Sequence, residues 1–279
     1  MAGLRELRKH LKSIRSIGQL AGAMKTVATA KYSRINAAYS AYSEYAGECR
    51  RILERFGADL AFSGRPTLET PRPPCFVVLG GNRGLCGSYN IELMSLFAKT
   101  LAQHPDALIV ACGKIAVQYC REKNISVCRE FIFNDVPDYS EAKELSEYLR
   151  SLYAEGKTDS IQILYQKFVN MLTQTPVCEP LLPCGASAAA EEDEDFRTVY
   201  IPDRETVLKK TILNCIDSAV YDSLLECAAG SQAATIMAMR SAYDNSQESS
   251  DKLETKINRI RQGEVTADVI EISYEPLEE

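Results

Sequence analysis

The N-terminal part of the chain contains the stretch that decides the fold, RKHLKSIRSIGQLAGAMKTVATAKYSRI (8–35). Apolar residues recur in and just before this stretch at the spacing of one helix face: Leu4, Leu7, Leu11 and Ile14, then Ile17, Met24, Val27 and Ile35. Small residues accompany them: Gly18, Ala21, Gly22, Ala28 and Ala30. A long helix with so narrow an apolar stripe is poorly stable alone, and small residues let two backbones approach closely. We therefore expect this helix to pair with another helix.

A second long helix is predicted at the other end of the chain, because proline is missing there too. Residues 1–65 and 203–275 contain none of the eleven prolines, and proline breaks a helix interior. Helices over 1–56 and 204–273 would be roughly 80 and 100 Å long at 1.5 Å per residue. The later segment repeats the helical spacing at Leu208, Ile212, Cys215 and Ala219, and again at Leu253, Ile257 and Ile260. We predict that helices within 1–57 and 204–274 form a long antiparallel coiled coil.

The middle of the chain alternates strand and helix patterns, which indicates an α/β domain inserted between the two helices. Residues 57–73 are typical of a linker, and 74–200 form the predicted Rossmann-like domain. Strands are expected at 75–80, 107–112 and 125–133, with helices at about 88–103, 113–123 and 139–155. Residues 160–170 and 175–182 are expected to form an antiparallel hairpin that turns near Gln174. The acidic stretch GASAAAEEDED (185–195) is predicted to be a solvated loop.

One glycine-rich segment, GGNRGLCGSYN (80–90), follows a predicted strand and precedes a helix, where phosphate-binding loops lie in α/β folds. Its glycines do not match the dinucleotide pattern GxGxxG, and no GxxxxGK[ST] occurs in the chain. We interpret these glycines as the requirement of a tight strand-to-helix turn. We expect no cofactor here.

Candidate catalytic and metal-binding groups are sparse. The only histidines are His10 and His104, and the ten cysteines contain no CxxC pair, so zinc-ligand spacing is missing. Most cysteines lie in apolar stretches, which predicts free buried thiols and indicates a reducing, cytoplasmic compartment. No catalytic residue and no metal site is predicted. Shape, stiffness and contact are the expected means of action.

Charge is distributed unevenly along the chain. Residues 1–34 hold eight basic residues and the single acid Glu6, a local charge of +7, whereas the whole chain carries −6. The N-terminal helix is therefore expected to face an acidic partner, which charge alone does not identify. We also expect reversal of Lys25 and Lys31 to Glu to leave the fold intact, because exposed helix charges contribute little to stability.

Four blocks, in order along the chain, resemble the gamma subunit of bacterial F-type rotary ATP synthase. The opening block 8–35 is similar to the family's R-x-K-S-I-x-x-T-x-K-I-T-x-A-M-K-M-V-A-A-A-K, and GGNRGLCGSYN to its S-D-R-G-L-C-G-G-x-N. AATIMAMRSAYDNS (233–246) and INRIRQGEVTADVIEI (257–272) resemble its two closing motifs. The chain departs from these motifs at Asn82, Thr235 and Gly263, which stand where the family usually has Asp, Arg and a helix-forming residue.

The resemblance implies a central rotor shaft that is not catalytic itself. In the family, the helical pair enters the ring of alpha and beta subunits, and the α/β domain binds the epsilon subunit and the membrane-embedded c-ring. Ion-driven rotation of that ring is thereby coupled to ATP synthesis or hydrolysis at the beta subunits, on the cytoplasmic face of the cell membrane. The implied contacts to the catalytic subunits are made by Met24, Lys25, Lys31, Arg240, Arg261 and Gln262.

Two alternatives and one detail remain open at this point. A coiled-coil protein could use its basic helix to bind nucleic acid, although the rest of the chain is acidic, so we expect no nucleic acid. A nucleotide-dependent enzyme could be built on the α/β insert. At the C-terminus, Pro276 should end the helix near Tyr274 and leave the acidic residues 275–279 out of any apolar environment.

Overall fold

The computed structural model describes residues 2–56, 62, 71–183 and 201–273. Two helices dominate it, α1 (Ala2–Phe56) at the start and α5 (Arg204–Ser273) at the end. Contacts group the chain into two units, and each helix contributes to both. The terminal unit contains 1–27 and 236–279, and the α/β unit contains 28–235.

The α/β unit is built on a five-stranded sheet in the order β3-β2-β1-β4-β5. The strands are β1 (Cys75–Leu79), β2 (Leu108–Cys112), β3 (Arg129–Phe131), β4 (Ile161–Phe168) and β5 (Gln174–Leu182). Three neighbouring pairs are parallel, and β4–β5 is an antiparallel hairpin. Three shorter helices connect the strands: α2 (Tyr89–Gln103), α3 (Lys114–Glu122) and α4 (Tyr139–Ala154). The predicted Rossmann-like insert with a partly parallel sheet is therefore confirmed.

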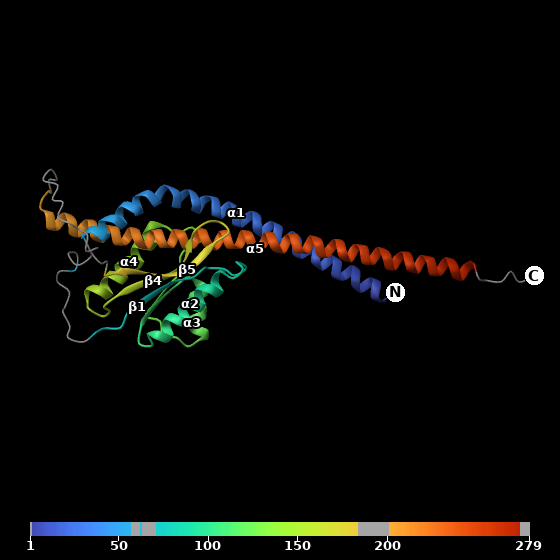
Figure 1. The fold of residues 1–279 in the computed structure, drawn as a ribbon, viewed down its shortest axis with the longest axis horizontal. Coiled ribbons are helices and arrows are strands. Elements are labelled where there is room, and N and C mark those ends of the chain that lie inside the picture. The colour runs from blue at the N-terminus through green and yellow to red at the C-terminus, as the bar shows by residue number, and fades with distance from the viewer. Residues whose placement is uncertain (1, 57–61, 63–70, 184–200, 274–279) are drawn as a thin grey trace, which may run out of the picture. The chain divides into compact units, whose positions relative to one another are not determined.

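Alternation of side chains along the strands gives the sheet two buried faces. Phe76 and Val78 of β1 point to one face and pack with Leu93 and Phe97 of α2 and with α3. Cys75, Val77 and Leu79 of β1 point to the other face, where they meet α4, α5 and the end of α1. Figure 1 shows α2 and α3 together on one side of the sheet and α5 passing along the other.

In the α/β unit, α1 and α5 pack against each other in opposite directions. The hydroxyl of Tyr42 donates to Ser218 Oγ at 3.0 Å, and that of Tyr39 donates to Glu226 Oε1 at 2.9 Å. As the residue number rises along α1 it falls along α5, which makes the pair antiparallel as predicted. Ile35, in the same part of α1, is fully buried.

In the terminal unit the same two helices approach closely through small residues. A Cβ on Gly18 would lie 2.3 Å from Ser246 Oγ, so glycine is what permits this separation. The amino group of Lys25 lies 5.4 Å from the ring centroid of Tyr243, and Arg15 forms an ion pair with Glu254. The order of these contacts shows that α1 and α5 are antiparallel here too.

Four details differ from the prediction. Strand β3 is shorter than 125–133, because the N–H of Ile125 instead donates to Cys120 O and closes the end of α3. The hairpin turns at Asn170, whose side chain accepts from Leu172 N and Thr173 N at 2.8 and 2.9 Å, and not near Gln174. Ala30 is exposed and not part of the helix contact. Ile17 and Val27 are also exposed, because glycine and alanine form the contact in their place.

The predicted acidic loop 185–195 and the tail 274–279 lie outside the described residues, and α5 is described to Ser273. The division into parts at 1–57, 74–200 and 204–274 stays a prediction.

Candidate functional site

Five of the six predicted partner-binding residues lie in the terminal unit. Arg240, Arg261 and Gln262 are exposed on α5, whereas Met24 and Lys25 are half-buried on α1. Arg240 makes only a loose ion pair with Asp244 one turn along the helix, at 3.9 Å. These exposed side chains are available to a partner, and Lys25 is positioned over the ring of Tyr243.

Large apolar side chains on the same two helices point to solvent. Six of them are at least half exposed: Ile17, Leu20, Val27, Val265, Val269 and Ile270. Single exposed apolar residues are ordinary, but two groups of them, one on α1 and one near the end of α5, indicate surfaces that a partner covers. The sequence did not predict these exposed residues, because helical spacing does not say which apolar residues face the partner helix and which face away.

The sixth predicted residue, Lys31, belongs to the α/β unit and is already paired. Its amino group contacts Asp135 Oδ2, and the two side chains are only 27% and 25% exposed. Arg83 approaches the same oxygen at 3.3 Å. The hydrogen bond from Lys31, helped by Arg83, holds the pKa of Asp135 below its usual range. The expectation that Lys31 is an exposed charge is therefore wrong.

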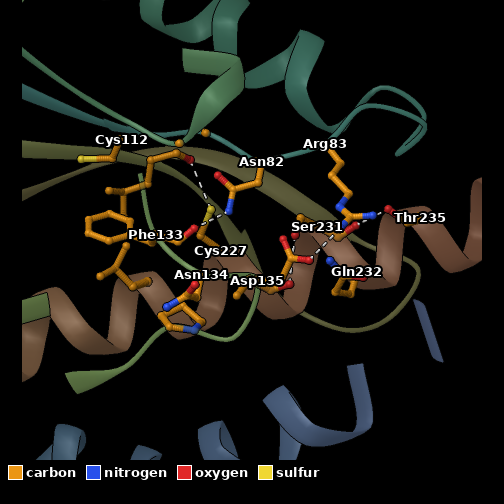
Figure 2. A pocket seen from close by; sticks show the side chains of 17 residues that line it. Asn82, Arg83, Cys112, Phe133, Asn134, Asp135, Cys227, Ser231, Gln232 and Thr235 are labelled. Atoms are coloured by element: carbon orange, nitrogen blue, oxygen red, sulfur yellow. Dashed lines mark hydrogen bonds and ion pairs between the residues drawn. The ribbon is translucent and has the colours of Figure 1, made fainter. Parts of the chain in front are cut away.

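The glycine-rich segment forms the turn between β1 and α2, as predicted (Figure 2). Gly80 N donates to Cys112 O at 2.8 Å, and Gly81 N donates to Asn90 Oδ1 at 3.2 Å. Gly113, at the end of β2, has a φ of 87°, and a Cβ there would lie 2.0 Å from Gly80 O. Only glycine permits this approach of the two strand ends.

Asn82 also has a structural role in this turn. Its side-chain amide donates to Phe133 O at 2.8 Å, and its Oδ1 accepts from Lys114 N at 3.4 Å. Asn82 thereby links the segment to the end of β3 and to the start of α3. This departure from the family's Asp is accommodated by an amide that donates as well as accepts.

The cavity beside the segment is too small to enclose a nucleotide. Its volume is about 50 Å³, whereas small-molecule sites are typically about 300–1,000 Å³. Thr235 lines it from α5, and its hydroxyl donates to Ser231 O at 2.8 Å. The interpretation of the glycines as a structural turn agrees with this geometry.

The cysteines of the described residues are free thiols, and most are buried. Burial raises the pKa of Cys75 to about 12 and that of Cys227 to about 11. Both thiols therefore stay protonated; Cys75 packs as an apolar group, as predicted, whereas the thiol of Cys227 also donates to Leu79 O at 3.2 Å.

Neither a metal-binding cluster nor a membrane-spanning helix is found among the described residues. No group of three His, Cys, Asp or Glu residues there is arranged to hold a metal ion. None of the described helices is long and apolar enough to cross a membrane.

Together, the fold defines a class of protein in which an α/β domain is inserted between two long terminal helices that pack antiparallel. A family model described as "ATP synthase" matches residues 3–273. The ATP synthase gamma chain of Desulforamulus reducens is 30% identical over 275 residues, which cover 98% of this chain and 97% of the relative. The gamma chain of Rubrobacter xylanophilus is 30% identical over 283 residues, with the same shares.

Solved structures share the fold. The rotor of the Euglena gracilis mitochondrial ATP synthase matches with a TM-score of 0.66 and 17% identity, over 95% of this chain and 99% of that chain. The central stalk and c-ring structure from Tetrahymena thermophila matches with a TM-score of 0.61 and 19% identity, over 80% of this chain and 99% of that chain.

The chain belongs to the ATP synthase gamma-chain family. The resemblance recognised in the four sequence blocks is thus confirmed, and with it the non-catalytic central-stalk role in F-type ATP synthase. The alternative of a nucleic-acid-binding coiled coil finds no support among these matches.

Proposed function

We propose that this chain is the rotor shaft that couples rotation of the membrane c-ring to ATP synthesis or hydrolysis at the beta subunits. The observation that carries the proposal is the terminal unit, with its exposed apolar side chains and exposed cations on a closely packed helical pair. Such a surface fits the interior of a ring of alpha and beta subunits. The α/β unit is the proposed attachment for the epsilon subunit and the c-ring.

Coupling requires that the shaft contact each beta subunit differently at each angle. A contact made with only one conformation of a subunit stabilises that conformation and shifts the population toward it. A pair of helices with different sequences can meet this requirement, because it presents different side chains in different directions. Rotation then presents a different set of contacts to each beta subunit in turn.

The proposed contacts to the catalytic subunits are made by Met24, Lys25, Arg240, Arg261 and Gln262. Lys31 completes the proposed set, but a partner carboxylate there has to compete with Asp135 for its amino group. As part of the complex the chain lies at the periphery of a membrane. We place it on the cytoplasmic face of the cell membrane.

Co-purification tests the assignment. The tagged chain, recovered from native membranes in mild detergent, should bring the alpha and beta subunits with it, and their absence would overturn the proposal. Leu20→Ser with Val27→Ser should then lower ATP-driven pumping in membrane vesicles by removing apolar contact area. Ile132→Ser, an equally exposed apolar residue of the α/β unit, is the comparison for lost apolar area outside the terminal unit, and it should not weaken the contact to the beta subunits.

A further inference from the structure

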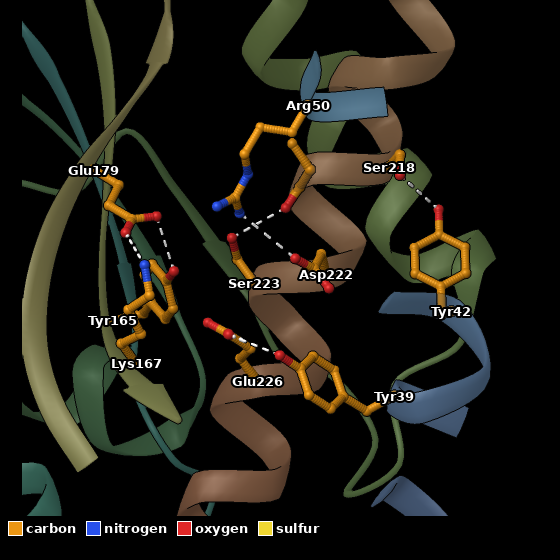
Figure 3. A network of polar contacts seen from close by, with 11 residues as sticks. Tyr39, Tyr42, Arg50, Tyr165, Lys167, Glu179, Ser218, Asp222, Ser223 and Glu226 are labelled. Carbon is orange, nitrogen blue, oxygen red and sulfur yellow. Dashed lines mark hydrogen bonds and ion pairs between the residues drawn. The ribbon is translucent and has the colours of Figure 1, made fainter. Parts of the chain in front are cut away.

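A cluster of carboxylates and tyrosines lies where α1 and α5 pack beside β4 and β5 in the α/β unit (Figure 3). A cavity of about 420 Å³ adjoins it. Acidic residues line this cavity from three elements: Glu54 of α1, Glu179 of β5 and Asp222 of α5. Arg50 of α1 lines it too. None of these residues is among those assigned above to a partner.

Two of the carboxylates in the cluster have close donors. Glu226 accepts from the hydroxyl of Tyr39 at 2.9 Å. Glu179 accepts from the hydroxyl of Tyr165 at 2.9 Å and from Lys167 at 2.7 Å. Figure 3 shows these donors directed at their acceptors from α1 and β4.

Asp222 has no comparably close donor among the described residues. It is only 9% exposed, and its Oδ1 is buried without a hydrogen-bond partner among the described residues. Its Oδ2 has only the guanidinium of Arg50 at 3.7 Å, and that side chain is 54% exposed. Water therefore screens the one cation that faces Asp222 closely, while Glu226 lies one turn further along α5.

We propose that the protonation state of Asp222 controls how tightly α1 packs on α5 in the α/β unit. With a proton bound, Asp222 is neutral and its burial beside Glu226 and Glu179 is tolerated. When the proton leaves, the buried Asp222 carboxylate is charged and is repelled by Glu226 and Glu179. Its ion pair with Arg50 is too long to offset that repulsion. The strain is relieved by opening the α1 contact around Tyr39 to Leu53, which lets water reach the carboxylate.

The charges around Asp222 agree with this arrangement. Burial, followed by Glu226, raises the pKa of Asp222 to about 6, and Glu179 acts in the same direction. Arg50 and Lys167 oppose the shift. Asp217, the other buried aspartate of α5, differs because Ser146 and Arg150 approach its Oδ1 at 2.5 and 3.3 Å. Only Asp222 combines burial with a missing partner in the described part of this cluster.

The direction of the pH effect follows from the higher proton affinity of the folded state. Stability supplied by the bound proton is fully present below the unfolded pKa of 3.8 and is lost as pH rises through about 6. For this group alone, the unfolding equilibrium constant should rise about tenfold between pH 5 and pH 7.5. Asp222→Asn, which is neutral at both values, should remove that tenfold change.

The experiment uses the full chain and needs no partner, so its outcome does not depend on the proposed function. Carboxyl-carbon NMR follows the titration of Asp222 in the wild-type chain, and hydrogen exchange, corrected for intrinsic rates, follows the amides of residues 39–53. We expect a midpoint near pH 6 and protection of these amides that falls as Asp222 ionises. The fall should be lost in Asp222→Asn and kept in Glu54→Gln, the matched control at the same cavity.

Two further variants test the direction of each charge. Arg50→Gln should move the Asp222 midpoint to higher pH, and Glu226→Gln should move it to lower pH. A wild-type midpoint near pH 4 would overturn the proposal. So would amide protection that changes equally in the wild-type chain and in Asp222→Asn.

Discussion

Charge reversal at Lys31 tests whether this residue stabilises the fold through an ion pair or serves only as a contact to a partner. Lys31 and Asp135 are both about three-quarters buried, but Asp135 keeps Arg83 at 3.3 Å when Lys31 is lost. Lys31→Met should therefore cost about 1 kcal/mol of unfolding free energy, less than the 3–5 kcal/mol of a fully buried pair. Lys31→Glu adds a carboxylate against Asp135. At an effective dielectric constant of about 20, repulsion at 4 Å reaches about 4 kcal/mol before the side chains relax.

After relaxation we expect Lys31→Glu to cost about 2–3 kcal/mol in total. Lys25→Glu is the control, because it removes an attraction to the Tyr243 ring worth about 0.5–1 kcal/mol and leaves the Lys31–Asp135 pair intact. Urea unfolding of the full chain, followed by circular dichroism, measures both values. The coupling is isolated by repeating Lys31→Met and Lys31→Glu in an Asp135→Asn background.

In that background the extra cost of Glu over Met should fall below about 0.5 kcal/mol, because the repelling charge is gone. The reasoning is refuted if the extra cost persists without Asp135. It is refuted equally if Lys25→Glu and Lys31→Glu destabilise the chain by the same amount.

Four other perturbations have expected outcomes, three of them in protein stability and one in ATP-driven pumping. Gly113→Ala should destabilise the chain by at least about 2 kcal/mol in the same urea assay, since it combines a positive φ with a Cβ placed against Gly80 O. Gly263→Ala should instead stabilise α5 by up to about 1 kcal/mol, because no described atom lies within 4 Å of the added Cβ; destabilisation would point to an unforeseen contact. Deleting residues 275–279 should leave ATP-driven proton pumping in membrane vesicles largely unchanged, and a large loss with intact assembly would contradict this. Acidification from pH 6 to pH 3 should reduce the stability that the Lys31–Asp135 pair gives to the folded chain. Because folding lowers the pKa of Asp135, this stability is present above the unfolded pKa and is lost as the pH falls below it. An Asp135→Asn variant should show a smaller loss across this range.

Local patterns predicted the elements well because their causes are local. The absence of proline and the helical spacing predicted α1 and α5 to within one or two residues, and short apolar runs predicted β1 and β2. The ends of elements were less predictable where a side chain or a backbone group had two possible partners. Asn170 is an example, since its side chain builds a turn that the strand propensities of its neighbours do not indicate.

Contacts between distant residues were not accessible from the sequence. Lys31 and Asp135 are separated by 104 positions, and nothing in either neighbourhood identifies the other as its partner. The same holds for the burial of Asp222, whose helical spacing is compatible with either a buried or a solvated face. Exposure of Ile17 and Val27 was mispredicted for a related reason. Apolar character predicts burial, but some apolar residues of a subunit become buried only when a partner subunit binds.

The pairing of the first helix with the last one has a consequence for biosynthesis. The partners Tyr42 and Ser218 are separated by 176 positions. At about 5–20 residues per second, a ribosome needs roughly 10–35 s to make the chain between them. During that time α1 has no partner, and the sheet face that α5 covers is open to solvent. The nascent chain should therefore be a substrate for chaperones until its last quarter emerges, and slowing translation should increase its aggregation.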